Sequence, residues 1–322
     1  VDSYVFDNGT VVRALTQSDL VTGDYSTAFA LLDVIPSPLI INLPDVAYYW
    51  SSTDDPEFYT TQCTIYEALA TYVEGRKDAF AVIDTPYGLP VDTALSFAGD
   101  AKGSSTGSHS AAYYPWVLAP DTLRSIPGSV VAVPPGGSVI GQYMQTDASR
   151  GVFKSPAGLG NPIALAVATE RRFTNAELDS LNSADVPLNA IRAVPGAGIC
   201  IMGARTLKNE VGDRYVNVRR TLIHLRKELE NRAAFAVFEN NDSLLWNRLR
   251  SSLSKFLLDF WSNGGLRGNT PGEAFYVKCD STTVTQSDIL NGQVNVEIGV
   301  ALEYPAEFVV INIGQITGSA SI

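Results

Sequence analysis

The chain of 322 residues contains no apolar run close to the roughly 20 residues that a membrane-spanning helix needs. Its N-terminal stretch, VDSYVFDNGT, also lacks the basic start and the apolar segment of a secretory signal. Cysteine is scarce: Cys63, Cys200 and Cys279 are odd in number and widely spaced, which excludes a disulfide scaffold and a cysteine metal clip. We therefore expect a soluble protein of a reducing compartment, with its thiols buried as small apolar groups.

Histidine is also scarce, although acid–base catalysis near neutral pH most often uses it. The common zinc, phosphate-loop, dinucleotide and calcium motifs do not occur, so we expect no metal and no cofactor. Residues 103–107 (GSSTG) match a serine-nucleophile pattern and residues 252–255 (SLSK) match S-x-x-K, but neither has the setting that its chemistry needs. An α/β hydrolase that uses Ser105 and His109 is therefore only the alternative function. His109 is expected to be a solvated loop residue, and His224 is expected to be exposed.

The composition is that of a folded protein, with 45% hydrophobic and 18% charged residues. A chain of this length usually forms two domains. The net charge of −11 is unevenly spread: residues 1–110 hold 15 acidic and 4 basic side chains, whereas residues 111–322 hold 19 of each. This pattern argues against a nucleic-acid-binding surface, which needs a net basic face. It fits two regions with different neighbours, or an acidic surface that keeps the protein soluble.

The first part of the chain has an α/β pattern. Residues 28–43 form two apolar runs split by prolines, and residues 79–83 form a third. Between the second and the third, residues 61–74 carry apolar side chains at helical spacing. Apolar runs that alternate with helices predict β-α-β units and a buried, mostly parallel sheet. A further helix is expected at 90–98 and a further strand at 111–118.

Two segments of this part are expected to be irregular. Residues 99–110 (GDAKGSSTGSHS) read as a mobile surface loop, and residues 123–160 are so rich in proline and glycine that long regular elements are not expected. Thr174 and Glu177 have the spacing of a capping box, which predicts a helix that starts there. We place a domain boundary near residue 188.

The last part of the chain has clear helical periodicity. One apolar stripe comprises Tyr215, Val218, Leu222, Leu225 and Leu229. A second helix is expected to begin near Asp242, to carry Leu245, Leu249, Leu253, Phe256 and Phe260, and to end at Asn263-Gly264-Gly265. At 100° per residue, four cations form a basic flank beside the first stripe. They are Arg219, Arg220, Arg226 and Lys227.

Two strands are expected at the end of the chain, at 294–302 and at 307–316 (EFVVINIGQI). The second is apolar on both faces, and a free edge of that kind is an aggregation hazard. It either forms a hairpin with 294–302 or adds to the sheet of a neighbouring subunit. The residues that would make such contacts are Phe308, Val309, Val310, Ile311 and Ile313.

Seven segments carry a resemblance to a known family. They are AAYYPWVLAP at 111–120, VAVPPGGSVIGQYMQTDASRGVFKSPAG at 131–158, NAIRAVPGAGICIMGARTL at 189–207, RYVNVRRTLIHL at 214–225, VFENNDSLLWNRLRSSLSKFL at 237–257, GEAFYVKCDSTT at 272–283 and IGVALEYPAEFVVINIGQ at 298–315. In this order they resemble the sheath protein of contractile phage tails, a family that includes the sheaths of contractile bacteriocins. Before residue 110 the resemblance is limited to the α/β pattern and to AFAVIDTP.

The resemblance implies an α/β fold in two domains. Residues 1–188 would form a mostly parallel-sheet domain, subtilisin-like but non-catalytic, with its acidic lobe facing outward. Residues 189–322 would form an α+β sheath domain with a terminal exchange strand. The family's usual N-terminal start and linker arm are not found here, so the chain is expected to be a fragment.

The resemblance also implies a mechanical function without catalysis. Subunits would form hexameric rings stacked helically around a tail tube and attached to a baseplate, and contraction would drive the tube through a host envelope. The sheath would be part of the virion and would be assembled in the cytoplasm of the bacterial host, with no nucleic acid bound and no membrane insertion. The four cations of the basic flank would be candidates for contact with the tube or a neighbour. The sheath could come from a phage, from a contractile bacteriocin or from another injection machine, and the resemblance fits all three.

Overall fold

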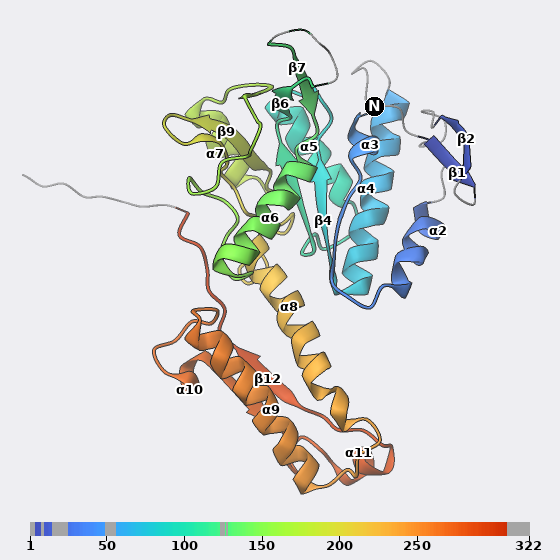
Figure 1. The fold of residues 1–322 in the computed structure, drawn as a ribbon, viewed down its shortest axis with the longest axis vertical. Helices are drawn as coiled ribbons and strands as arrows, with labels where there is room; N and C mark the ends of the chain where they lie inside the picture. Colours follow the sequence, from blue (N-terminus) through green and yellow to red (C-terminus); the bar gives the residue numbers. More distant parts are fainter. Residues whose placement is uncertain are drawn as a thin grey trace, which may run out of the picture.

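A computed structural model describes residues 4–7, 10–14, 25–48, 56–122, 126 and 128–307 of the chain. Figure 1 shows an upper α/β lobe and a smaller lower lobe, joined by helix α8 (Val216–Ala233). After the lower lobe, the described chain returns upward to the α/β lobe. Among the described residues, no helix is both long and apolar enough to cross a bilayer.

The α/β lobe is built on a five-stranded sheet in the order β10-β9-β5-β4-β3. Its strands are β3 (Leu39–Asn42), β4 (Ala79–Asp84), β5 (Ser110–Tyr114), β9 (Asn189–Val194) and β10 (Gly198–Ile201). The first four run parallel to one another, and β10 pairs antiparallel with β9. The predicted β-α-β units and mainly parallel sheet are confirmed, and the antiparallel edge strand makes the sheet mixed.

Helices cover both faces of this sheet, which explains the uninterrupted apolar run of β4. Ala81 and Ile83 pack in a core with helices on one face, and Phe80 and Val82 pack in a second core on the other. Because successive strand residues point to opposite faces, a strand buried on both sides must be apolar throughout. The helices of this lobe are α2 (Tyr25–Ala30), α3 (Pro44–Tyr48), α4 (Pro56–Arg76), α5 (Val91–Lys102), α6 (Gly136–Arg150) and α7 (Asn175–Ser183).

Three local predictions for this lobe are wrong. The first apolar run, near residues 28–35, is not a strand but helix α2 followed by the 3-10 turn η1 (Leu31–Val34). The expected strand at 111–118 divides into β5 and β6 (Val117–Pro120), which belong to different sheets. The proline- and glycine-rich segment contains α6, a helix of 15 residues. Pro134 and Pro135 directly precede the first residue of α6, where a missing N–H removes no helical hydrogen bond.

Smaller elements complete the α/β lobe. β6 forms a three-stranded sheet with β7 (Val130–Val133) and β8 (Ala168–Thr169), and β1 (Tyr4–Asp7) pairs with β2 (Thr10–Ala14). The predicted capping box is confirmed at the start of α7. The Thr174 side chain accepts from the Glu177 backbone N–H, and the Glu177 carboxylate accepts from the Thr174 N–H.

The lower lobe packs helix α9 (Ser243–Ser262) against α8 and against a two-stranded sheet. As predicted, Asp242 caps α9 through bonds from the N–H groups of Leu244 and Leu245, and Asn263 follows its last turn. The remaining elements are η2 (Ala234–Ala236), α10 (Pro271–Ala274), β11 (Phe275–Lys278), α11 (Gln286–Leu290) and β12 (Glu297–Val300). The three cysteines are free and buried, as predicted.

Helix α8 belongs to both lobes. Val216 and Ile223 pack in a core of the α/β lobe, whereas Leu225 packs in a core of the lower lobe. Strands β9 and β10, which follow residue 188, lie in the sheet of the α/β lobe. The two lobes therefore meet along α8.

Candidate functional site at the root of the C-terminal tail

The geometry around Ser105 is not that of a serine nucleophile. The GSSTG segment follows helix α5 and precedes strand β5, the reverse of the strand–turn–helix order that a nucleophile elbow needs. The Ser105 hydroxyl donates to the Lys102 carbonyl oxygen at 2.7 Å, whereas His109 Nδ1 lies 3.0 Å from the Ser108 hydroxyl. The structure therefore gives Ser105 and His109 different partners.

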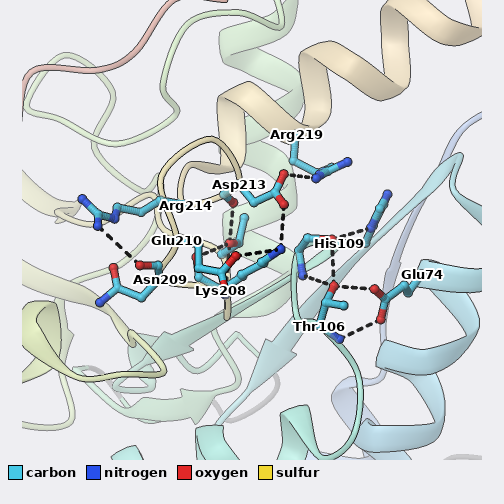
Figure 2. A network of polar contacts seen from close by, with 11 residues as sticks. Glu74, Thr106, His109, Lys208, Asn209, Glu210, Asp213, Arg214 and Arg219 are labelled. Atoms are coloured by element: carbon cyan, nitrogen blue, oxygen red, sulfur yellow. Dashed lines mark hydrogen bonds and ion pairs between the residues drawn. The ribbon is translucent and has the colours of Figure 1, made fainter.

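The loop that holds these residues is anchored rather than solvated, which corrects the prediction for His109. Figure 2 shows Thr106 bound to Glu74, and the Thr106 N–H donates to that carboxylate at 2.8 Å. His109 is 7% exposed. Burial, with help from the nearby Arg219 charge, lowers the pKa of His109 to about 4. His109 is therefore a neutral, buried residue at neutral pH. His224 is half-buried with its ring 6.0 Å from that of Phe260, so the prediction of an exposed side chain is also wrong.

Asp84, at the end of β4, also has a structural role. Its carboxylate accepts from the Gly136 backbone N–H at 2.6 Å and from Asn42 Nδ2 at 2.8 Å. Gly136 is the first residue of α6, so the carboxylate caps that helix. Burial raises the pKa of Asp84 to about 6. Among the described residues, no group of three or more His, Cys, Asp or Glu side chains is placed to hold a metal ion.

The four cations of the predicted basic flank divide into two pairs. Arg220 is 7% exposed, contacts Asp147 through both terminal nitrogens at 3.0 and 2.5 Å, and lies over the ring of Tyr143. Arg219 pairs with Asp213, which also accepts from Lys208 at 2.9 Å (Figure 2). Although burial opposes it, contact with these two cations holds the pKa of Asp213 below its ordinary value. Arg220 is therefore buried and paired within the subunit, and the contact of the four cations with a tube or a neighbour stays a prediction.

Arg226 and Lys227 lie further along α8. Arg226 pairs with Glu230 one turn later, and both side chains are 53% exposed. Lys227 is half-buried and forms no ion pair with any described residue. Of the four predicted contact residues, Arg226 and Lys227 are more accessible to a partner molecule than Arg219 and Arg220, whose charges pair with Asp213 and Asp147.

The clearest constellation is the root of the C-terminal tail, residues 301–307. Leu302 forms an isolated bridge with Leu266 of the lower lobe. Asn217 Nδ2 then donates to the Glu303 carbonyl oxygen at 3.1 Å, and the Tyr304 ring lies edge-on to Tyr215 at 6.1 Å. The chain thus leaves the lower lobe and runs along the start of α8.

The root ends in an ion pair with the α/β lobe. Arg205 Nε donates to Glu307 Oε1 at 3.0 Å and Nη2 donates to Oε2 at 2.5 Å. The Tyr215 hydroxyl donates to the same carboxylate at 3.3 Å. The hydrogen bond to Glu307 also raises the pKa of Arg205 further above its ordinary value.

The other contacts of Arg205 hold it in place. Its remaining terminal nitrogen donates to the Asn182 carbonyl oxygen at 2.5 Å. Asn189, the first residue of β9, accepts from the Arg205 N–H and donates to its carbonyl oxygen, both at 2.7 Å. Arg205 is 8% exposed and Asn189 is 1% exposed. The end of the root is therefore connected to the central sheet.

Sequence reasoning missed Arg205 and Glu307 as partners, because an ion pair 102 residues apart has no periodicity. The residues predicted to exchange lie just beyond this anchor. Phe308, Val309, Val310, Ile311 and Ile313 all fall outside the described residues.

The lower lobe has a sheet of only two strands, β11 and β12, which pair antiparallel from Phe275 with Val300 to Lys278 with Glu297. Within the described part of the chain, no third strand joins them. Gly299 lies opposite Tyr276, whose ring occupies the space that a side chain at 299 would need. Along β11 and β12 themselves, the described residues form no further strand pairing at the outer edges of this sheet.

Comparisons with known proteins agree with this architecture. Residues 214–316 match the family model described as the phage tail sheath C-terminal domain. The tail sheath protein of Vibrio phage KVP40 is 26% identical over 185 residues, which cover 56% of this chain and 26% of that protein. The match thus spans about a quarter of the curated relative.

Solved structures match over more of their length. The helical sheath of the anti-feeding prophage in its contracted state is 28% identical with a TM-score of 0.74, over 94% of this chain and 77% of that one. The sheath complex of an extracellular contractile injection system, PVC, also in the contracted state, is 25% identical with a TM-score of 0.68, over 87% and 92% of the two chains. A sheath tail protein from Listeria innocua, 11% identical with a TM-score of 0.53, shares the fold.

In its mixed α/β fold and over most of its length, this chain is similar to the sheath proteins of contractile injection systems. The resemblance predicted from the sequence is confirmed. The family model of the phage tail sheath C-terminal domain supports the same resemblance for residues 214–316.

Proposed function

We propose that this chain is a structural, non-catalytic subunit that polymerises as stacked hexameric rings around a tail tube and contracts to drive the tube through a host envelope. The matches to sheath proteins over most of the chain support a mechanical role. Its partners would be copies of itself, the tube protein and the baseplate. The polymer would be assembled in the bacterial host cytoplasm and would become part of the virion or of a related injection particle.

The observation that carries the proposal is the path of the tail root. A hairpin between 294–302 and 307–316 needs the two segments to lie about 5 Å apart. Instead, Glu307 is bound to Arg205 of the α/β lobe, while β12 lies in the lower lobe. This geometry disfavours the hairpin, so the apolar segment from Phe308 onward is proposed to pair with a neighbour.

The β11–β12 sheet is the proposed acceptor of a neighbour's tail. Two-stranded sheets are marginal alone, and a third strand would add backbone hydrogen bonds. Ile298 and Val300 are half-buried and pack against the core of the lower lobe. An apolar strand added at this edge would extend the same core.

The lobes would have separate roles. We propose that the domain division falls within α8 rather than near 188, since β9 and β10 belong to the first sheet. The α/β lobe would be a non-catalytic relative of the subtilisin-type fold. Two cations on α8, the exposed Arg226 and the half-buried Lys227, would contact acidic groups of the tube or a neighbour. Arg219 and Arg220 would keep α8 in place through their own acidic partners.

Removal of residues 308–322 from the full-length protein tests the exchange strand and leaves Glu307 in place. Negative-stain microscopy should show tubes for the unaltered protein and monomers for the truncated one. Circular dichroism and melting temperature should show that the truncated protein is folded. Normal tubes from a truncated, folded protein would contradict strand exchange.

A further inference from the structure

The tail root is held by the α/β lobe at a position whose geometry is unusually well defined. Arg205 gives Glu307 two parallel hydrogen bonds, the arrangement that most restricts the orientation of a carboxylate. The Glu307 side chain is 20% exposed and the Arg205 side chain 9%, so the pair is largely shielded from solvent. Screening by salt is correspondingly weak.

Neither side of this contact can pivot easily. Arg205 is fixed through its backbone by Asn189 and through its third nitrogen by Asn182. Tyr215, which precedes α8, binds the Glu307 carboxylate through its hydroxyl and packs its ring against Tyr304. The last described residue of the root is thus tied to β9 and to the start of α8.

We propose that Arg205, Tyr215 and Glu307 form a tail clamp, a set of positioning residues that fixes the direction in which the tail strand leaves the subunit. The clamp keeps the apolar tail away from its own β12 and presents it to a second copy of the chain. It also transfers tension on the tail to β9 of the five-stranded sheet, so that tension bypasses the two-stranded sheet. This inference rests on the proposed strand exchange and adds the residues that orient it.

A charge-removing variant tests the clamp. Glu307→Gln in the full-length protein keeps the size of the side chain but loses the charge that pairs with Arg205. We expect the subunit concentration needed for half-maximal tube formation, followed by light scattering and microscopy, to rise about tenfold, a factor equivalent to one lost charged contact. Tyr215→Phe, which removes only a hydroxyl, should raise it about threefold.

Glu303→Gln is the matched control. Glu303 lies in the same root, its carboxylate has no ion-pair partner among the described residues, and only its backbone oxygen is used. We expect this variant to assemble like the unaltered protein. Equal weakening by Glu303→Gln and Glu307→Gln would show an effect of net charge and would overturn the clamp.

A second measurement separates direction from stability. Arg205→Lys keeps the positive charge but cannot make two parallel bonds to Glu307 while also binding Asn182. We expect hydrogen exchange of the tail amides in the monomer to slow relative to the unaltered protein, because the released tail pairs with its own β12. The melting temperature should stay within about 2 °C. If Arg205→Lys changed neither the hydrogen exchange of the tail amides nor tube formation, the proposed tail clamp would be wrong.

The two proposals fail differently. If the unaltered protein makes no tubes, the proposed function fails. The hydrogen exchange of the tail amides in Arg205→Lys then tests by itself whether the tail clamp exists. If the unaltered protein and Glu307→Gln make tubes at the same concentration, the clamp fails and the proposed function stands.

Discussion

Replacement of Asp147 by asparagine probes the joint between the lobes, because Asp147 at the end of α6 pairs with Arg220 inside α8. The Arg220 side chain is 7% exposed and that of Asp147 is 30% exposed. Removing one partner of a fully buried ion pair costs about 3 to 5 kcal/mol, since the other charge is left without compensation. Asp147 is partly solvated, so we expect Asp147→Asn to lower the free energy of unfolding by about 2 kcal/mol.

The double variant Asp147→Leu/Arg220→Met makes this prediction specific. Arg220→Met alone should cost about 2 kcal/mol, because it leaves Asp147 unpaired and removes the cation–π contact with Tyr143. Well-packed apolar replacements of both partners are often nearly neutral. The double variant should therefore cost much less than the sum of Asp147→Leu and Arg220→Met measured singly, with a coupling energy of about 2 kcal/mol.

Urea unfolding followed by tryptophan fluorescence supplies the measurement. Trp116 is buried in the α/β lobe, while Trp246 and Trp261 pack in the lower lobe, so the fluorescence reports on both lobes. The exposed pair Arg226–Glu230 is the control, and Arg226→Met should change stability by no more than about 0.5 kcal/mol. Strict additivity of the Asp147 and Arg220 substitutions would refute the reasoning.

Three further predictions concern other parts of the molecule. The pKa of His109 is lowered from 6.5 to about 4, so its contribution to stability is present above pH 6.5 and is lost as the pH falls toward 4. His109→Gln should flatten this part of the pH profile, and an unchanged slope in calorimetry would count against a neutral buried His109. Asp242→Ala should lower the free energy of unfolding by about 1 kcal/mol through loss of the α9 cap. An unchanged free energy of unfolding would show that this cap does not stabilise the protein. Reversing the charge of Arg226 and Lys227 together should weaken tube formation most at low salt, with an unchanged melting temperature, whereas no effect at low salt would make them an ordinary solvated face.

Elements with local signals could be predicted from the sequence. Helix α9 has a single apolar stripe and an aspartate cap, and β4 is apolar from residue 79 to residue 83, so the sequence predicts both correctly. The apolar stripe of α8 does not predict which of its other side chains are buried, because a helix packed against two lobes is buried on more than one side. Arg220 and Asn217 are buried there although they lie outside the apolar stripe.

Other misses have equally physical causes. The apolar run that became α2 and η1 suggests a buried strand, yet Leu31 and Val34 are exposed. His109 lies in a Gly/Ser-rich stretch, which tertiary contacts hold in place, such as those of Thr106 with Glu74 and of Ser104 with Glu67. The tail clamp joins residues far apart in sequence, so no spacing rule could reveal it.

Electron microscopy of the full-length protein expressed alone tests the central claim most directly. The account predicts cylinders with a helical repeat, in which the tail strand of each subunit lies on the β11–β12 sheet of another. A protein that stays monomeric under all conditions, or cylinders in which each tail pairs with its own β12, would contradict it.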